Sequence, residues 1–320
     1  MEMTEEVGVS KSVAVFACTA MAFFYVTILY APTVLLRLPR PTSFKQFLIR
    51  RFFCAAISSV FSFLFSALIL PVKRWEPSYL LGVYGMRLDH LWQAVVFPLS
   101  LTSLMYAGSL VVKYLLLVNL WKEYKNHGGG TLFDCIRRVP QKLLGWIFSL
   151  ASNVVAWRNY VVAPITEELV FRACMIPLLL CGGFRIYTVI FLCPVFFSLA
   201  HLNHFFELYG QQNRSLLRAS MVVGLQLGYT VIFGSYASFL FIRTGFRARP
   251  AGHLLAPVVA HIFCNMMGLP VLFSRRNGII VVAFVAGMVG FLWLLFPVTS
   301  PNLYNARTDN CRCWPGHCLH

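Results

Sequence analysis

The sequence predicts an all-α protein that crosses a membrane several times. Only 12% of its 320 residues are charged and 58% are hydrophobic, which gives a mean hydropathy of +0.71. A water-soluble domain carries about 25% charged residues, so this chain cannot cover a surface that faces water. The apolar residues also come in runs of about twenty, the length that a helix needs to cross a bilayer. Together these observations favour a bundle of transmembrane helices.

The apolar residues form nine candidate segments, and we expect about eight spans. The longest uncharged segments cover residues 13–36, 52–72, 91–112 and 279–298. The others cover residues 143–163, 169–180, 187–200, 219–242 and 254–273. The first segment is longer than the core of a signal peptide, about 7–15 residues, and it follows three glutamates where a signal peptide has basic residues. We therefore expect this segment to remain as an anchor.

The net charge of +16 comes from basic residues that lie between the apolar segments, in residues 37–51, 122–142 and 243–249. An excess of Lys and Arg in short loops is typical of the cytosolic side, and it attracts anionic lipid headgroups. Two spans separate the first two stretches, so both fall on the same side, and the acidic N-terminus then faces the lumen. The third falls there too if an even number of spans intervenes. We expect contact with membrane lipid and no binding of nucleic acid.

Two adjacent carboxylates form the first candidate site, because ionisable residues inside apolar runs are costly. Thr166 is expected to cap a helix whose first turn contains Glu167 and Glu168. Glu168 and Arg172 are four residues apart and can form an ion pair, whereas Glu167 points about 100° away. Glu167 would then be free to act as a general base. The alternative is that both acids only cap a helix at the membrane surface.

Histidines near two other apolar segments extend this candidate site. His201 and His204 follow one segment, three residues apart. His261 and Asn265 are four residues apart on one helix face, where both can donate hydrogen bonds toward one point, as a developing oxyanion requires. The alternative is that they hold neighbouring helices together. Cys264 points off their shared face and no serine lies in a nucleophile context, so the sequence favours attack by an activated water.

In these motifs the chain resembles the type II CAAX prenyl endopeptidases, the Ras-converting enzymes, within the CPBP/ABI family of intramembrane proteases. The similarity covers roughly residues 155–270, and the flank at residues 161–166 looks like that of eukaryotic members. The family carries Glu-Glu-x-x-x-Arg, Phe-x-x-x-His and His-x-x-x-Asn motifs in that order. The matching residues are Glu167-Glu168 with Arg172, Phe197 with His201, and His261 with Asn265.

The resemblance implies an endopeptidase that removes the last three residues after a prenylated cysteine. It implies a multi-pass protein of the endoplasmic reticulum membrane, with prenylated CAAX tails as substrates and an active site reached from the cytosolic side. In catalysis it implies that Glu167 and His201 activate the water, and that His261 and Asn265 stabilise the oxyanion. The residues with supporting roles would be Glu168, Arg172 and His204.

Two alternatives remain open. Glu167, His201 and His261 can together hold zinc, as two histidines and a carboxylate do in some metallopeptidases, although no His-Glu-x-x-His motif is present. We expect no metal or other cofactor. A non-enzymatic transporter or scaffold is the other alternative, although the repeated halves typical of transporters are not visible.

We expect one membrane domain in three parts. Residues 1–150 hold the N-terminal transmembrane helices and cytosolic loops, 151–275 the catalytic core, and 276–320 the last span and a tail. The tail contains three cysteines and two histidines without the spacing of a zinc module, so we expect a mobile end.

Overall fold

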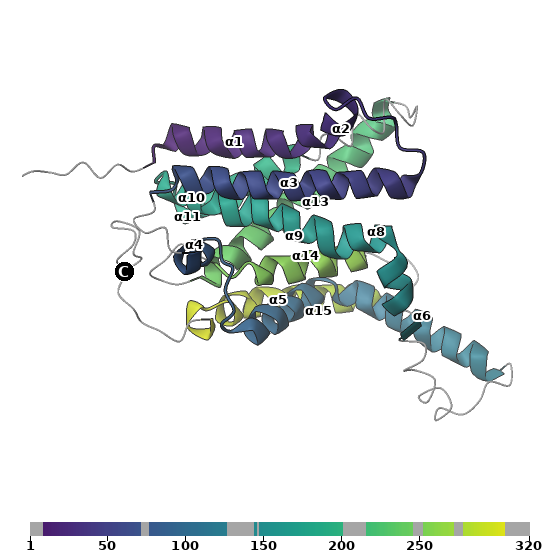
Figure 1. Ribbon diagram of the computed structural model, residues 1–320. Helices are drawn as coiled ribbons and strands as arrows, with labels where there is room; N and C mark the ends of the chain where they lie inside the picture. The colour runs from purple at the N-terminus through teal and green to yellow at the C-terminus, as the bar shows by residue number, and fades with distance from the viewer. Residues whose placement is uncertain are drawn as a thin grey trace, which may run out of the picture.

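The protein is a bundle of helices (Figure 1). The computed structural model describes residues 9–71, 77–126, 144–145, 147–200, 216–245, 252–271 and 278–304, and every regular element within these ranges is helical. The elements outside the central path are α1 (Lys11–Thr27), η1 (Ile28–Tyr30), α2 (Ala31–Val34), α3 (Phe44–Ile69), α4 (Pro77–Val83), α5 (Leu91–Met105), α6 (Ala107–Asn126), α11 (Ile186–Ala200), α13 (Leu216–Arg243), α14 (Leu255–Met267), α15 (Gly278–Val298) and η5 (Pro301–Leu303).

The central path is one continuous helical stretch from Val154 to Cys181 that alternates between α-helical and π-helical turns. Asn153 caps its start: the Asn153 side-chain oxygen accepts hydrogen bonds from the backbone N–H groups of Val155 and Ala156. Its parts are α8 (Val154–Trp157), the π-turn η2 (Arg158–Val162), α9 (Ala163–Glu168), the π-turn η3 (Leu169–Cys174) and α10 (Met175–Cys181).

The prediction that a helix starts at Thr166 is wrong, because the helix already runs through this residue. Thr166 Oγ1 donates to the Val162 carbonyl one turn earlier, at 2.7 Å, and caps nothing. Pro164 suggests a helix start, since proline lacks the N–H that a helix interior uses. The π-turn before it absorbs this defect. In that turn the Ala163 N–H donates to the Arg158 carbonyl, five residues back.

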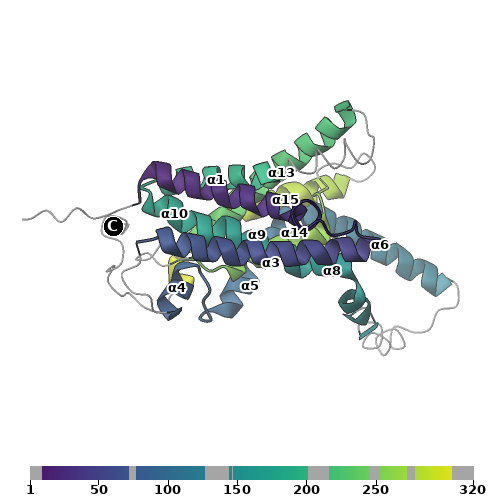
Figure 2. The same cartoon turned by 45° about the horizontal axis from the view of Figure 1, so that its top comes forward.

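The central path packs between two groups of helices. On one side it contacts α1 and α3, and on the other α14, which in turn packs against α5 (Figure 1). Helix α11 pairs closely with α13, which rises away from the bundle at one end in Figure 2. The middle of the path is buried from Val170 to Leu179. Arg172 lies within this stretch, and Glu168, which is also fully buried, lies just before it.

The prediction of an all-α, multi-pass membrane protein is confirmed. Four helical segments of the described chain are long and apolar enough to cross a membrane: Lys11–Val34, Phe44–Ile69, Ser220–Arg243 and Gly278–Val298. The pair α5 and α6, bent by 81°, adds a fifth if it is one broken span, and α11 and α14 are apolar but shorter. The expected number of about eight spans is therefore higher than the number of spanning helices in the described part of the chain. One reason is that segments 143–163 and 169–180 contribute to one continuous path.

A glycine allows α15 to cross the bent α5–α6 pair at close range. A Cβ atom on Gly287 would overlap the Leu104 carbonyl oxygen and lie 2.6 Å from the Ala107 Cβ. Small residues at such crossings are how helices approach closely in a membrane. Gly290, almost one turn further along α15, has room for a Cβ atom, since the nearest atom is Leu104 Cδ2 at 3.7 Å.

We expect Gly287→Ala to lower the stability of the protein by about 1–3 kcal/mol, the usual cost of overpacking a tight contact. The measurement is the midpoint of thermal unfolding in detergent. Gly290→Ala is the matched control and should leave the midpoint unchanged or raise it, because its helix-favouring methyl group would make only ordinary van der Waals contact with Leu104. Equal midpoints for the two variants would contradict the close crossing.

Candidate active site

A buried polar cluster of three side chains lies where the central path meets α14. Glu168 Oε1 accepts a hydrogen bond from Arg172 Nη1 at 3.1 Å and another from His261 Nδ1 at 2.7 Å. The side chains of Glu168 and Arg172 have no exposed surface. The ion pair predicted from their spacing of four is therefore present. The ion pair neutralises the Glu168 carboxylate. A separate hydrogen bond joins this carboxylate to the imidazole of His261, from a distant part of the chain.

Aromatic rings surround the arginine of this cluster. The Arg172 guanidinium lies 4.5 Å from the ring centroid of Phe197 and 5.9 Å from that of Phe233. Its Nε and Nη2 atoms make no hydrogen bond with the described residues, so the electron-rich ring faces are the polar partners on that side. Gly234 leaves the space that Arg172 needs, because a Cβ atom there would lie 3.1 Å from Nη2. Phe197 of the second motif thus supports Arg172.

His261 has two distinct ring nitrogens. A carboxylate paired with arginine can only accept, so Nδ1 of His261 carries the proton that bonds Glu168. The other nitrogen, Nε2, lies 3.8 Å from Glu167 Oε2. The ring packs edge-on against Phe233, with 5.0 Å between the ring centroids. Nε2 therefore accepts a hydrogen bond when the ring is neutral, and donates one when both nitrogens are protonated.

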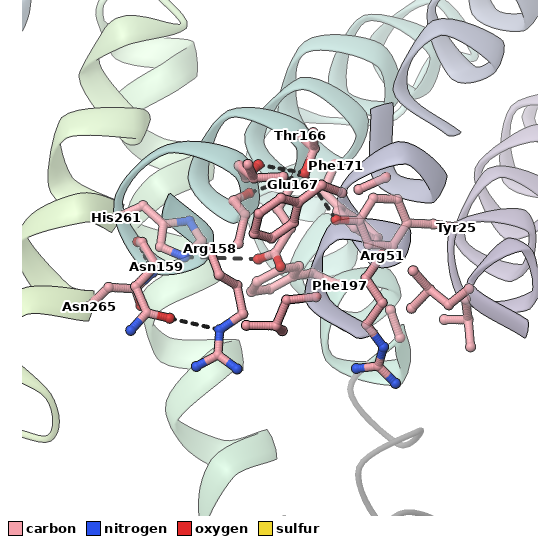
Figure 3. Close-up of a pocket in the computed structure, with 18 of the residues that line it drawn as sticks. Tyr25, Arg51, Arg158, Asn159, Thr166, Glu167, Phe171, Phe197, His261 and Asn265 are labelled. Atoms are coloured by element: carbon pink, nitrogen blue, oxygen red, sulfur yellow. Dashed lines mark hydrogen bonds and ion pairs between the residues drawn. The ribbon is translucent and has the colours of Figure 1, made fainter. Parts of the chain in front are cut away.

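Glu167 stands apart from the ion pair and faces a cavity of about 600 Å³ (Figure 3). Its side chain is 17% exposed, whereas that of the adjacent Glu168 is fully buried. His261 and Asn265 line the same cavity, together with residues from α1, α3, α11 and α13. The two neighbouring glutamates thus have different surroundings, as their helical spacing predicts. One is held in a buried cluster, and the other reaches a space that a substrate can enter.

The central path lines the cavity with a period of four residues. An α-helix has 3.6 residues per turn, so positions four apart drift around its axis, whereas a π-turn is wider and reduces that drift. The π-turn η2 therefore keeps three successive turns facing one cavity. The lining residues of these turns are Arg158 and Asn159, Val162 and Ala163, and Thr166 and Glu167.

Asn265 bridges α14 to the central path. Its Nδ2 donates to the main-chain carbonyl of Asn159 at 2.9 Å. In the π-register that carbonyl would need the N–H of Pro164, five residues on, and proline has none. A carboxamide has two N–H donors, and Asn265 makes no second bond with the described residues. Asn265 therefore does hold two helices together, as the alternative interpretation of the sequence predicted. Its second N–H remains available to the cavity.

Three residues of the site belong to none of the sequence motifs. Tyr25 of α1 lines the cavity and donates its hydroxyl proton to Thr166 Oγ1 at 3.2 Å, because Thr166 spends its own proton on a backbone carbonyl. Arg51 and Arg158 also line the cavity (Figure 3), although Arg51 belongs to a basic stretch that is predicted to be cytosolic and Arg158 belongs to no motif. All three are far from Glu167 in sequence or belong to no motif.

His201 and His204 lie outside the described residues. The described part of the chain contains no group of three or more His, Cys, Asp or Glu side chains placed to hold a metal ion. Because His201 is the third ligand of the zinc alternative, this observation leaves that alternative open. The tail with Cys311, Cys313 and Cys318 also falls outside the described residues.

The fold and the site together define a class: a multi-pass membrane protein in which a carboxylate and an imidazole face one cavity inside the bundle, an arrangement suited to acid–base hydrolysis. A family model, type II CAAX prenyl endopeptidase Rce1-like, matches residues 144–267. CAAX prenyl protease 2 of Arabidopsis thaliana is 62% identical over 99% of both chains. CAAX prenyl protease 2 of Homo sapiens is 34% identical over 93% of this chain and 85% of its own length.

The chain belongs to the family of type II CAAX prenyl endopeptidases, and it is a peptidase. No solved structure matches it. The family membership favours the enzyme over the transporter or scaffold that the sequence alone left open.

We expect Glu168→Ala to destabilise the protein by about 3–5 kcal/mol, because it leaves the Arg172 cation buried without its counter-charge. Thermal unfolding in detergent measures this. Glu167→Ala is the matched control, since it removes a neighbouring carboxylate that is not part of the ion pair, and it should unfold close to wild type. The double variant Glu168→Leu/Arg172→Leu should recover part of the loss. Equal destabilisation by both single variants would contradict the assignment.

Proposed function

We propose that the protein cleaves the peptide bond after the prenylated cysteine of CAAX proteins and releases the C-terminal tripeptide. The observation that supports this most strongly is the separation of the two glutamates. Glu168 is neutralised by Arg172, whereas Glu167 faces the cavity 3.8 Å from His261 Nε2. A free carboxylate next to an imidazole is what activation of a water requires. The relatives named CAAX prenyl protease 2 supply the substrate class.

In the proposed mechanism Glu167 takes a proton from a water that attacks the scissile carbonyl carbon. The carbonyl π electrons move to its oxygen, which becomes an oxyanion on a tetrahedral carbon. Collapse of this intermediate breaks the C–N bond, and the proton held by Glu167 passes to the leaving amine. The products are a prenylcysteine carboxylate and a tripeptide with a new amino group. We assign His201 to the water as well, on the match to the family motif.

His261 and Asn265 are the proposed oxyanion donors. Asn265 can donate through the N–H that does not bond Asn159. His261 can donate through Nε2 when its ring carries both protons, because Nδ1 is already committed to Glu168. Glu168 and Arg172 then act by holding the His261 ring in place. We assign His204 a supporting role for His201. Preorganised donors of this kind lower the barrier most when they need no rearrangement during the reaction.

The cavity suits a substrate that is half lipid and half peptide. Apolar side chains from η1, α3 and α13 also line the cavity, among them Leu29, Phe52 and Val222. A prenyl chain gains about 0.8 kcal/mol for each CH₂ group that leaves water, so its cysteine stays at the bilayer. We propose that the enzyme works in the endoplasmic reticulum membrane, in contact with lipid, and receives tails from the cytosolic side. Nucleic acid has no place in this function.

The zinc alternative is supported by one feature of the site. Histidines that bind metal usually donate their other ring N–H to a carboxylate, and His261 does this to Glu168. In that case Glu167, His201 and His261 would be the ligands. We favour the metal-free mechanism, and a chelator distinguishes the two.

Purified wild type should release the tripeptide from a farnesylated CAAX peptide in detergent, and Glu167→Gln should reduce kcat by about 10²–10⁴, the usual contribution of a general base. Activity of wild type should survive 1,10-phenanthroline. Loss of activity with the chelator, and its return with added zinc, would establish the metal alternative. No tripeptide from wild type under any condition would contradict the proposed function.

Pro164→Ala tests whether the orphaned Asn159 carbonyl positions Asn265. The variant restores an N–H that can compete for this carbonyl, so we expect kcat to fall about fivefold, the equivalent of one ordinary hydrogen bond. Stability should hold or rise, because alanine is the better helix residue. Asn265→Ala should cost more, about 2.7–4 kcal/mol in transition-state stabilisation. An unchanged rate for Asn265→Ala would make this residue an interhelical contact alone.

A further inference from the structure

Two arginines lie at one edge of the active-site cavity. Arg158 and Arg51 both line the cavity that contains Glu167 and His261. Figure 3 shows both guanidinium groups at the lower edge of the site, with Glu167 above them. They come from different elements, Arg158 from the π-turn η2 and Arg51 from the second turn of α3. Two cations at one edge of a site with apolar walls focus a positive potential there.

The Arg158 side chain is held so that it can bind an anion. Its Nε donates to the Asn159 side-chain oxygen at 2.9 Å, which orients the guanidinium by one nitrogen. Among the described residues no carboxylate pairs with it, and its two terminal nitrogens remain at the cavity. A guanidinium binds a carboxylate through two parallel hydrogen bonds and holds it in a defined orientation. The chemistry at this edge therefore fits a carboxylate.

The distance from Arg158 to the proposed reacting centre matches the length of the released peptide. Arg158 precedes Glu167 by nine residues on one helical path, which at the α-helical rise of about 1.5 Å per residue is at most roughly 13 Å along the axis, because the wider π-turn at residues 158–162 rises less per residue. An extended tripeptide spans about 10 Å. With the scissile carbonyl beside Glu167, the end of the tripeptide comes within reach of a long side chain at position 158.

We propose that Arg158, assisted by Arg51, binds the α-carboxylate that ends the CAAX tail, and so sets the cut three residues from that end. The inference rests on the proposed function, because only a substrate cut so close to its C-terminus presents this carboxylate to the site. It makes Arg158 a specificity-determining residue. It also explains why the cavity has basic side chains at one edge and a free glutamate deeper inside.

The test compares two farnesylated peptides that are identical except at the C-terminus, one a free acid and the other a carboxamide. Wild type should cleave the amide with about tenfold lower kcat/KM, the effect expected when a charge-assisted hydrogen bond is lost at a partly exposed site. Arg158→Ala should lose about tenfold on the acid and nothing further on the amide. Arg158→Lys should fall between the two, since it keeps the charge without the fork.

Arg40→Ala is the matched control. Arg40 belongs to the same predicted cytosolic basic stretch as Arg51, is exposed and does not line the cavity. Its variant should keep the wild-type preference for the acid, which separates a specific contact from a general attraction of anionic peptide to a basic surface.

Equal cleavage of acid and amide by wild type would overturn the carboxylate subsite and leave the proposed function standing. The same holds if Arg158→Ala loses activity equally on both peptides. Because the comparison of acid and amide in wild type needs no variant, it remains decisive even if Arg158→Ala fails to fold. Cleavage of neither peptide by wild type would instead overturn the proposed function, and this inference with it.

Discussion

The structure depends on one interaction, the buried ion pair between Glu168 and Arg172. Neither side chain reaches solvent, so each charge would be very costly without the other. The same carboxylate oxygen also accepts the proton of His261 Nδ1, which joins the central path to α14. Because Glu168 is occupied in this way, the adjacent Glu167 is the carboxylate that is left for the cavity. The division of work between two neighbouring glutamates thus follows from where one arginine lies on the helix.

The second constraint lies in the backbone of the central path. A π-turn before Pro164 lets a proline sit inside a helix and leaves the Asn159 carbonyl without a helical partner. Asn265 donates a hydrogen bond to this carbonyl, so the missing helical bond in the central path provides an anchor point for α14. The same π-turn keeps the lining residues at a period of four on one face. π-Turns are often found at functional sites, and here the reason is geometrical.

The N-terminal helices complete the site even though the matched family model covers only residues 144–267. Tyr25 of α1 bonds Thr166, one residue before Glu167, and Arg51 of α3 stands at the cavity edge. The apolar wall also draws on both helices. The identity to the Arabidopsis thaliana relative extends over 99% of the chain, so the N-terminal part is shared as well as the motifs. In the proposed function, these helices contribute Arg51 and part of the apolar lining to substrate binding, beside Arg158 of the central path, whereas the chemistry is assigned to the motifs.

The sequence by itself determined the class of fold, because long apolar runs can be stable only as helices in a membrane or in a large bundle. It also determined the Glu168–Arg172 pair and the separate direction of Glu167, since both follow from helical spacing over a few residues. The predicted helix start at Thr166 was wrong because Pro164 suggests that a helix begins there, and only the π-turn shows that the helix continues through the proline. The tertiary structure alone decided that His261 reaches Glu168 from 93 residues away, that Asn265 takes the Asn159 carbonyl, and that Tyr25, Arg51 and Arg158 share one cavity. These contacts join distant segments through packing, and no local pattern of residues encodes the distance between two helices.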